Sequence, residues 1–372
     1  MNPQSVIRVG IIGCGNISNA YFSGIAQFSD LLRIDACADL DLTRAAAKAA
    51  EHGVARSLSV DELLADPNID LIVNLTIPAA HGPINLAALR AGKHVYCEKP
   101  FATNRAEAEE ILRLAEASGL RAGTAPDTFL GAGLQTCRHL IDSGAIGTPV
   151  AATAFMVCGG HENWHPSPEF YYQKGGGPLF DMGPYYITAL VDLLGPVRRV
   201  SASARASFPT RTITSEPLKG TVIPVDTPTH YSGTLDFVNG AIASVIMSFD
   251  VVSHHLPCLE IHGSEGSLSC PDPNGFHDEN SIKLRKAGQS EWEIVPLVHT
   301  HRTGRGMGVA DMAMAIRSDR AHRCSGTLGA HVLEVMLAFG ESSDSGKHIA
   351  IQSQCARPLA VPTDLAPGTI DA

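Results

Sequence analysis

The chain has 372 residues, of which 44% are hydrophobic and 18% charged, so it is long enough for two or three globular domains with large cores. Its net charge of −10 argues against nucleic acid or an anionic membrane as a partner, and apolar runs such as residues 335–339 are too short to span a bilayer. No signal peptide is visible after Met1, and nine cysteines occur without a Cys-x-x-Cys pair, so we expect reduced thiols and a cytoplasmic protein.

The first motif is a glycine-rich loop between a strand and a helix. Residues 6–12 are mostly apolar, as in a buried strand, and Gly13-Cys14-Gly15-Asn16-Ile17-Ser18 follows at once. This is the dinucleotide-binding fingerprint, with a serine at the third glycine position. Gly13 permits the tight turn, and Gly15 lets a pyrophosphate approach the backbone at the start of the helix. We therefore expect Gly13, Gly15, Asn16 and Ile17 to bind a dinucleotide.

A second strand, residues 33–38, ends at Asp39, which lies 24 residues after Gly15. A carboxylate at this place usually binds the adenosine ribose hydroxyls and repels the 2′-phosphate of NADP. Asp41 adds to that repulsion, whereas Arg44 weakens it. The sequence therefore predicts NAD, with NADP as the less favoured cofactor. In the plainer alternative, Asp39 is only a turn residue.

The alternation of strands and helices continues up to about residue 125. Residues 69–75, 94–97 and 120–125 are strands, and helices capped by Ser59 and by Asn104 lie among them. Such alternation predicts a parallel sheet, which binds ligands beyond the carboxyl ends of its strands. Candidate residues fall at these strand ends, and we expect them to form one composite site: Gly13, Asp39, Thr76, Lys99 and Asp127.

Two segments complete the predicted cofactor site. In the first, Thr76, Pro78 and His81 follow the strand at 69–75. In the second, Glu98-Lys99-Pro100 follows the strand at 94–97, where a lysine is well placed to meet a bound cofactor. Pro100 restricts the local backbone, and the Lys99–Pro100 bond can be cis. The alternative for Lys99 is an ordinary surface lysine at a strand-to-loop corner.

After about residue 126 the pattern changes to longer strands with alternating polarity, joined by hairpin-length turns. This predicts a mostly antiparallel open sheet with one face solvated or covered by a second copy of the chain, hence a homodimer or homotetramer. The expected domains are 1–127, an α/β dinucleotide-binding domain; 128–350, an α+β domain; and 351–372, a C-terminal tail. Strands are expected at 150–158, 198–204, 231–237, 241–250, 259–262, 267–270, 282–285 and 291–296, and helices at 134–142, 310–318 and 328–340.

A polar and aromatic segment follows the first strand of this second half. His161-Glu162-Asn163-Trp164-His165 spells H-E-x-x-H, a zinc motif only when it lies on a helix. Two glycines precede it and two prolines follow it, so we expect no helix and no metal there. His161, Trp164 and His165 suit a polyhydroxylated ligand, although Trp164 can equally be a core residue.

Asp181 and Tyr185 lie four residues apart and share one face if the segment is helical. Aimed at Lys99, an acid and a phenol form a proton-handling cluster. In the alternative, Asp181 caps the helix and Tyr185 packs in the core.

Three motifs together resemble the glucose–fructose oxidoreductase, inositol dehydrogenase and rhizopine-catabolism (Gfo/Idh/MocA) family over about residues 5–350. They are the glycine loop at Gly13, the Glu98-Lys99-Pro100 triplet, and Gly175-Gly176-Gly177 followed by Asp181. The resemblance implies a Rossmann domain followed by an open α+β sheet domain, and hydride exchange between NAD or NADP and a sugar or polyol. It also implies catalytic roles for Lys99, Asp181 and a histidine four residues later, where this chain has Tyr185.

A tyrosine is a poor base at pH 7 because its ordinary pKa is about 10, although a lysine ammonium and the nicotinamide charge nearby would lower it. We therefore expect Lys99, Asp181 and Tyr185 to handle the proton, with His165 as a competing base and Asp127, His161 and Trp164 as further substrate contacts. Two other functions stay open: a hydrolase or lyase that retains NAD and oxidises a sugar transiently, and a non-catalytic dinucleotide sensor.

Overall fold

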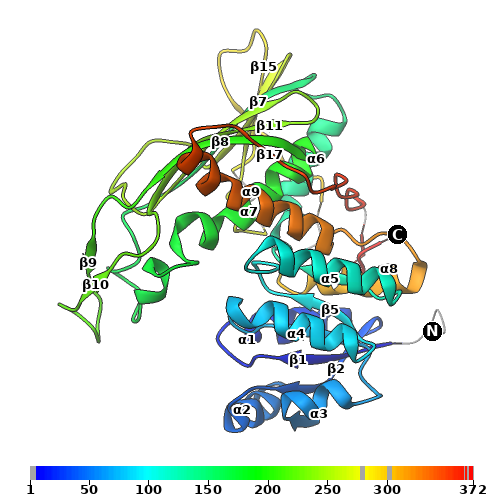
Figure 1. The fold of residues 1–372 in the computed structure, drawn as a ribbon. Helices are drawn as coiled ribbons and strands as arrows, with labels where there is room; N and C mark the ends of the chain where they lie inside the picture. Colours follow the sequence, from blue (N-terminus) through cyan, green and yellow to red (C-terminus); the bar gives the residue numbers. More distant parts are fainter. Residues whose placement is uncertain (1–5, 277–280, 300–303, 364, 367, 372) are drawn as a thin grey trace. The chain divides into compact units, whose positions relative to one another are not determined.

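The computed structural model describes residues 6–276, 281–299, 304–363, 365–366 and 368–371. It contains two compact units, shown in the ribbon of Figure 1, and each is built from separate stretches of the chain. Unit 1 comprises Met1–Gln135, Val298–Leu333 and Pro358–Ala372, and unit 2 comprises Thr136–Leu297 and Glu334–Arg357. Residues 1–5, where no signal peptide was visible in the sequence, lie outside the described part.

Unit 1 contains a six-stranded sheet in the order β3-β2-β1-β4-β5-β6, in which every neighbouring pair is parallel. This confirms the parallel sheet that the sequence predicts. The strand β3 was not predicted, because three residues are too few to show a pattern. The strands are β1 (Ile7–Ile12), β2 (Leu32–Ala38), β3 (Arg56–Leu58), β4 (Leu71–Asn74), β5 (His94–Cys97) and β6 (Ala122–Thr124).

Helices lie on both faces of this sheet (Figure 1). Two of the predicted caps are present: Ser59 and Glu62 form a capping box at α3, and the Asn104 side chain accepts a hydrogen bond from the Glu107 backbone N–H at α5. The helices are α1 (Ser18–Ile25), α2 (Leu42–His52), α3 (Val60–Ala65), α4 (Pro78–Arg90), α5 (Arg105–Ala117) and α8 (Met307–Ser318), with short 3-10 turns η1 (Ala26–Phe28) and η2 (Thr128–Leu130).

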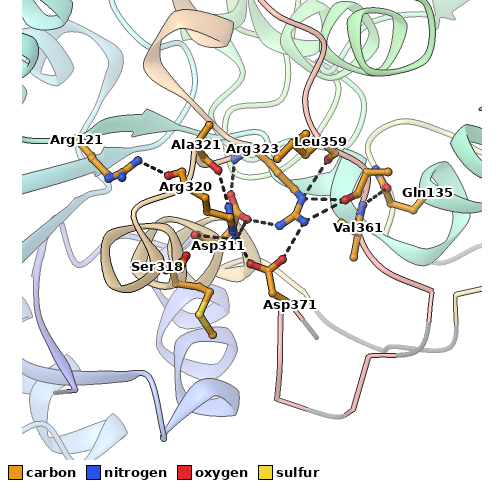
Figure 2. Close-up of polar contacts among 12 residues, drawn as sticks. Arg121, Gln135, Asp311, Ser318, Arg320, Ala321, Arg323, Leu359, Val361 and Asp371 are labelled. Carbon is orange, nitrogen blue, oxygen red and sulfur yellow. Dashed lines mark hydrogen bonds and ion pairs between the residues drawn. The ribbon is translucent and has the colours of Figure 1, made fainter. Parts of the chain in front are cut away.

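The compact units differ from the consecutive domains 1–127 and 128–350 that we predicted, because the chain returns to unit 1 after residue 297. An isolated β-bridge joins Gly123 of β6 to Ser325, and the Thr124 backbone N–H donates to the Cys324 carbonyl at 3.1 Å. The segment predicted as a tail from 351 is also tied down in its last part, where Arg323 donates to the carbonyls of Leu359 and Ala360 (Figure 2). Contacts between residues so far apart leave no pattern in the sequence.

Unit 2 contains a nine-stranded sheet in the order β16-β15-β14-β13-β7-β12-β11-β8-β17. Its pairs are antiparallel except β7–β12, which confirms the mostly antiparallel sheet that we predicted. The strands are β7 (Pro149–Val157), β8 (Val197–Arg205), β11 (His230–Phe237), β12 (Ile242–Ser248), β13 (Leu259–Gly263), β14 (Gly266–Cys270), β15 (Lys283–Lys286), β16 (Glu293–Ile294) and β17 (Ile349–Ala350).

One face of this sheet packs against helix α7 (Gly177–Leu194), which contacts β7, β11 and β12. On the opposite face, Ala151, Thr153 and Phe155 of β7 are half-exposed and pair in register with β12. This is the solvated or covered face that the sequence predicts, and its pairing with a second copy stays a prediction. The remaining helices are α6 (Ala132–Asp142) and α9 (Gly326–Ser345). Within the described residues, no helix combines the length and apolarity needed to cross a membrane.

A small hairpin, β9 (Thr210–Thr212) with β10 (Val222–Pro224), stands apart from the large sheet (Figure 1). Its buried residues Ile213 and Ile223 form an apolar cluster with Tyr172 and Phe249. Tyr172 belongs to the 3-10 turn η3 (Glu169–Tyr172). The hairpin therefore anchors the segment that holds the candidate substrate residues.

His94, the first residue of β5, makes the stability of unit 1 dependent on pH. Its Nδ1 accepts the Arg121 backbone N–H at 2.9 Å, and burial, followed by the Arg121 charge, lowers the pKa of His94 to about 4. The unfolded chain binds this proton near pH 6.5, so the free energy of unfolding is expected to fall by about 3 kcal/mol as the pH drops from about 6.5 to about 4. Chemical denaturation at pH 7 and pH 4 measures this loss.

The control is His94→Gln, whose amide oxygen can still accept the Arg121 N–H but binds no proton. This variant is expected to lose less stability than the wild type over the same pH interval. An identical loss in both proteins would assign the pH dependence to other groups.

Candidate functional site

The glycine loop after β1 has a backbone that a ligand can approach closely. Gly13 has φ +99°, and a Cβ there would lie 2.7 Å from the Leu75 carbonyl oxygen, so no side chain fits. A Cβ on Gly15 would meet no heavy atom within 4 Å, which leaves the outer side of the loop open. Ser18 is buried and its hydroxyl donates to the Gly15 carbonyl at 2.7 Å. No side chain caps α1, so its start suits an anionic ligand.

Asp39, directly after β2, is bonded to this loop. Its Oδ2 accepts the Cys14 backbone N–H at 2.8 Å, and its Oδ1 accepts the Asp41 backbone N–H at 2.9 Å. The Arg44 guanidinium lies 3.4 Å from Oδ1. Asp39 thus shapes the turn, as the plainer reading of the sequence proposed, and also places a carboxylate beside the glycine loop.

The loop after β4 is organised by Asn74, whose Oδ1 accepts the Thr76 backbone N–H and hydroxyl at 3.2 and 2.7 Å. Pro78 starts α4 and is exposed. His81 is fully buried, and its two ring nitrogens lie 3.0 Å from the Thr76 carbonyl and 2.7 Å from the Pro100 carbonyl. These contacts make His81 the link between the loops that follow β4 and β5. That it also binds the cofactor stays a prediction.

Glu98 directly follows β5 and is held by three groups. Its Oε1 accepts the Tyr21 hydroxyl at 2.8 Å and lies 3.7 Å from Arg305, and its Oε2 accepts the Lys99 backbone N–H at 3.0 Å. Burial, followed by the Glu98 charge, raises the pKa of Tyr21 well above its usual value, so this phenol stays a neutral donor. The Lys99–Pro100 bond is cis, and the Lys99 side chain is half-buried. Glu98 therefore fixes the backbone of Lys99.

Asp127, which follows β6, was predicted to contact the substrate. It is fully buried, and its Oδ2 accepts the backbone N–H groups of Gly306 and Gly308 at 2.9 and 3.1 Å at the start of α8. Burial is the main reason that the pKa of Asp127 is raised. Asp127 therefore holds the N-terminus of a helix, and its contact with the substrate stays a prediction. The sequence hid this role because α8 lies about 180 residues further along the chain.

In unit 2, two of the predicted site residues, His161 and Asp181, contact each other. The His161 Nε2 lies 3.4 Å from the Asp181 Oδ2. His161 is in a turn, as expected for a segment flanked by glycine and proline, whereas Asp181 lies in the second turn of α7. Tyr185 follows one turn later on the same helix and is buried. Within the described residues, no group of three or more His, Cys, Asp and Glu side chains is arranged to hold a metal ion.

Aromatic rings surround this acid and histidine. The rings of Tyr171 and Phe249 lie 4.2 and 4.5 Å from the His161 ring, and Trp164 lies at 5.2 Å. Trp164 is 59% exposed, which excludes the alternative that it is a core residue. His165 is oriented differently, because its Nδ1 accepts the Ser167 backbone N–H at 3.0 Å and its carbonyl accepts the Ser215 hydroxyl.

The segment that contains His161 and Glu162 is held by a network of charged side chains that the sequence did not reveal. Arg211 of β9 donates to the Glu162 Oε1 at 2.9 Å and also pairs with Asp250. The second oxygen of Glu162 accepts the Tyr172 hydroxyl. Arg211 lies 49 residues from Glu162 and 39 from Asp250, so no local spacing pointed to it. Through Glu162, the network fixes the backbone next to His161.

The residues of unit 1 fit a dinucleotide. A glycine loop with no room for a Cβ at Gly13 and an open outer side at Gly15, an uncapped helix start and a carboxylate after β2 are the parts that bind a pyrophosphate and a ribose. Their places at the carboxyl ends of β1 and β2, with Thr76 and Lys99 after β4 and β5, form the shared edge that the sequence predicts. Lys99 belongs to unit 1, whereas Asp181 and Tyr185 belong to unit 2, and their convergence stays a prediction.

Two family models match the chain and together cover most of both sheets. The model described as "Oxidoreductase family, NAD-binding Rossmann fold" matches residues 7–125, and the model described as "GFO/IDH/MocA C-terminal domain" matches residues 134–269. Both carry the family name that the motifs suggested.

Two curated relatives share about a third of their aligned residues with this chain or fewer. The 1,5-anhydro-D-fructose reductase of Ensifer adhaerens is 29% identical over 297 residues, which cover 78% of this chain and 83% of that protein. Inositol 2-dehydrogenase 3 of Saccharopolyspora erythraea is 33% identical over 150 residues, which cover 39% of this chain and 44% of that protein. The second match therefore spans less than half the length of the relative.

Solved structures share the fold over nearly the whole chain. A structure titled NAD binding oxidoreductase from Klebsiella pneumoniae has a TM-score of 0.81 at 22% identity, and covers 94% of this chain and 100% of that chain. Levoglucosan dehydrogenase, in complex with NADH and L-sorbose, has a TM-score of 0.80 at 22% identity, and covers 93% of this chain and 99% of that chain. At this identity the similarity shows the fold.

Proposed function

The chain belongs to the Gfo/Idh/MocA family of oxidoreductases, whose N-terminal domain is an NAD-binding Rossmann fold, and we propose that it oxidises a hydroxyl-bearing carbon of a sugar or polyol. The observation that carries this proposal is the shared edge of unit 1, where Gly13, Asp39, Thr76 and Lys99 all follow parallel strands. The names of the relatives, which include a reductase of an anhydro sugar and an inositol dehydrogenase, support this substrate class.

The proposed reaction splits into a hydride and a proton. A nicotinamide cofactor, when bound, would supply the acceptor for the hydride of the carbinol carbon; residues of the protein would accept the proton of the hydroxyl, so that an alcohol becomes a carbonyl. Lys99, held by the Glu98 contact to its backbone, is the proposed ammonium beside the reacting hydroxyl. Asp181 and Tyr185, one turn apart on α7, are the proposed proton-handling partners from unit 2.

Trp164 and His165 are the proposed substrate contacts outside this cluster. An exposed indole offers an apolar face to the C–H groups of a sugar ring, and imidazole groups donate to and accept from hydroxyls. The rings of Trp164 and His165 lie 5.3 Å apart and those of His165 and Phe170 lie 5.4 Å apart. These side chains therefore form one continuous aromatic surface in unit 2.

NAD is the proposed cofactor in preference to NADP. The Asp39 carboxylate lies beside the glycine loop, at the place where a 2′-phosphate would meet negative charge. Arg44 partly neutralises that charge from 3.4 Å. We therefore expect kcat/KM to be higher with NAD than with NADP, but not to vanish with NADP.

The decisive experiment measures NADH formation at 340 nm with a panel of monosaccharides, inositols and sugar acids, each with NAD and with NADP. At least one compound is expected to give turnover that saturates with both substrates. Purified protein that retains NAD through gel filtration and forms no net NADH would favour a hydrolase or lyase acting by transient oxidation. Dinucleotide binding without any chemistry would instead identify a sensor.

A further inference from the structure

The helix that carries Asp181 lacks a histidine at the place where the family resemblance implies one. Tyr185 occupies that place, four residues after Asp181. The imidazole that meets Asp181 comes from a turn 20 residues before it, and the His161 Nε2 lies 3.4 Å from the Asp181 Oδ2. This distance is at the long end for a hydrogen bond, and such bonds often shorten when substrate binds.

The His161 ring is held in one orientation. Tyr171 meets it edge-on with ring centroids 4.2 Å apart, and Phe249 packs against it at 4.5 Å. The residue is 9% exposed. Its backbone N–H donates to the Tyr172 hydroxyl at 3.2 Å, and its carbonyl accepts the His165 backbone N–H at 3.0 Å. An imidazole confined in this way points at Asp181 without the support of a helix.

The surroundings of its two nitrogens select one tautomer. Nδ1 is buried and has no hydrogen-bond partner among the described residues, whereas Nε2 faces a carboxylate oxygen. A neutral imidazole carries its hydrogen on one nitrogen only, and a buried N–H without an acceptor costs about 1–3 kcal/mol. The hydrogen therefore belongs on Nε2, where it is donated to Asp181.

We infer that His161 replaces the missing helix histidine as the partner of Asp181, and that it acts as a positioning residue whose Nε2–H keeps the carboxylate in one orientation during proton transfer. This inference rests on the proposed function, in which Asp181 handles the proton of the substrate. The Glu162–Arg211–Asp250 network serves the same end, because it fixes the residue next to His161.

The kinetic test compares His161→Leu, which removes the N–H donor, with His161→Gln, whose amide can still donate to Asp181. With the sugar or polyol that the panel identifies, the leucine variant is expected to lose about 10–100-fold in kcat, since small misplacement of a reacting group has effects of this size. KM for NAD should change less than twofold, and glutamine should restore part of kcat. A wild-type kcat in His161→Leu would overturn the inference.

The matched control is His254→Leu. His254 is an exposed histidine of unit 2 whose Nδ1 accepts only a local backbone N–H, that of Leu256, and its replacement is expected to leave kcat unchanged. If His161→Leu does not fold, the test compares His161→Gln with His161→Ala instead. Equal kcat values in these two folded variants would overturn the role of the donated hydrogen bond.

A second readout needs no turnover. Nitrogen-15 NMR of labelled histidines distinguishes Nε2–H from Nδ1–H, and the wild-type protein is expected to show His161 as the Nε2–H tautomer. In Asp181→Ala the Nε2 resonance is expected to shift, because Nε2–H loses its carboxylate acceptor. Hydrogen on Nδ1 in the wild type would overturn the inference, whereas an Nε2–H tautomer in a protein that oxidises no polyol would support the His161–Asp181 bond and reject the proposed function instead.

Discussion

Replacement of Lys99 by methionine is expected to lower kcat about 10²–10⁴-fold, which is the range that positioned acid–base groups contribute. Methionine keeps the unbranched stem of the lysine but removes its ammonium group. The backbone of residue 99 is held by the Glu98 carboxylate, through the main-chain N–H, and by His81, which contacts the Pro100 carbonyl. Because neither contact uses the lysine side chain, the loop should keep its shape in the variant.

Lys99→Arg separates two roles of the ammonium. Arginine keeps a positive charge but does not give up a proton near neutral pH. If Lys99 only stabilises developing negative charge, kcat of Lys99→Arg should be at least tenfold higher than kcat of Lys99→Met. If Lys99 exchanges a proton, the two variants should have the same low kcat. Stopped-flow measurement of NADH formation, together with titration of NADH fluorescence, distinguishes a loss of chemistry from a loss of cofactor binding.

The exposed Lys219, which lies in the connection between β9 and β10, provides the control. Lys219→Met removes the same charge and is expected to keep the wild-type kcat. If Lys99→Met retained full activity on every active substrate, the proposed proton-handling cluster would be rejected, while the dinucleotide site after β1 would be unaffected.

The sequence predicted the parallel sheet of unit 1 well because its signals are local. The apolar run before Gly13, the Ser59–Glu62 capping box and the Asn104 cap all act within a few residues of where they occur. The carboxyl ends of parallel strands necessarily meet at one edge, so Gly13, Asp39, Thr76 and Lys99 could be grouped before any coordinates existed.

The sequence did not reveal where a polar side chain supports another segment of the chain. His81 and Asp127 both follow strands of the sheet and were assigned to ligands, which stays a prediction; the structure adds that each is buried and bonded to backbone groups. A sequence shows that a histidine or an acid follows a strand; it does not show whether a backbone carbonyl or N–H lies within reach. Likewise, we expected Tyr185, with His165 as the competing base, to replace the family histidine, and His161 only to contact the substrate. The structure places the His161 ring beside Asp181, because the turn at 161–164 directs it towards α7.

The strongest stability effect is expected at Arg323, in the polar cluster of unit 1 shown in Figure 2. Its guanidinium donates to the Asp311 Oδ1 at 2.5 Å and to the Asp371 Oδ1 at 2.9 Å. It also donates to the Ala360 carbonyl at 3.0 Å. Asp311 is fully buried and the Arg323 side chain is only 4% exposed. One cation therefore joins Asp311 of α8 to Ala360 and Asp371 of the same unit.

Arg323→Met is expected to lower the free energy of unfolding by about 3–5 kcal/mol, because it leaves the buried Asp311 with one fewer cation and removes donors from two carbonyls. The Arg320 guanidinium lies 2.7 Å from the Asp311 Oδ1 and so limits the loss of stability. The carbonyls of residues 359 and 360 accept hydrogen bonds from Arg323. Urea denaturation at pH 7 measures the change.

Arg33→Met is the matched control for this variant. Arg33 also forms a 2.5 Å ion pair, with Asp35, but its side chain is 64% exposed. Water and salt screen an exposed pair, so its loss is expected to leave the free energy of unfolding almost unchanged. The two arginines have the same ion-pair distance, but Arg323 is buried and bonded to Asp371 and two carbonyls as well, so the difference between the two variants measures what burial and these further contacts add together. Equal losses would show that the C-terminal residues are held to α8 by apolar contacts rather than by Arg323.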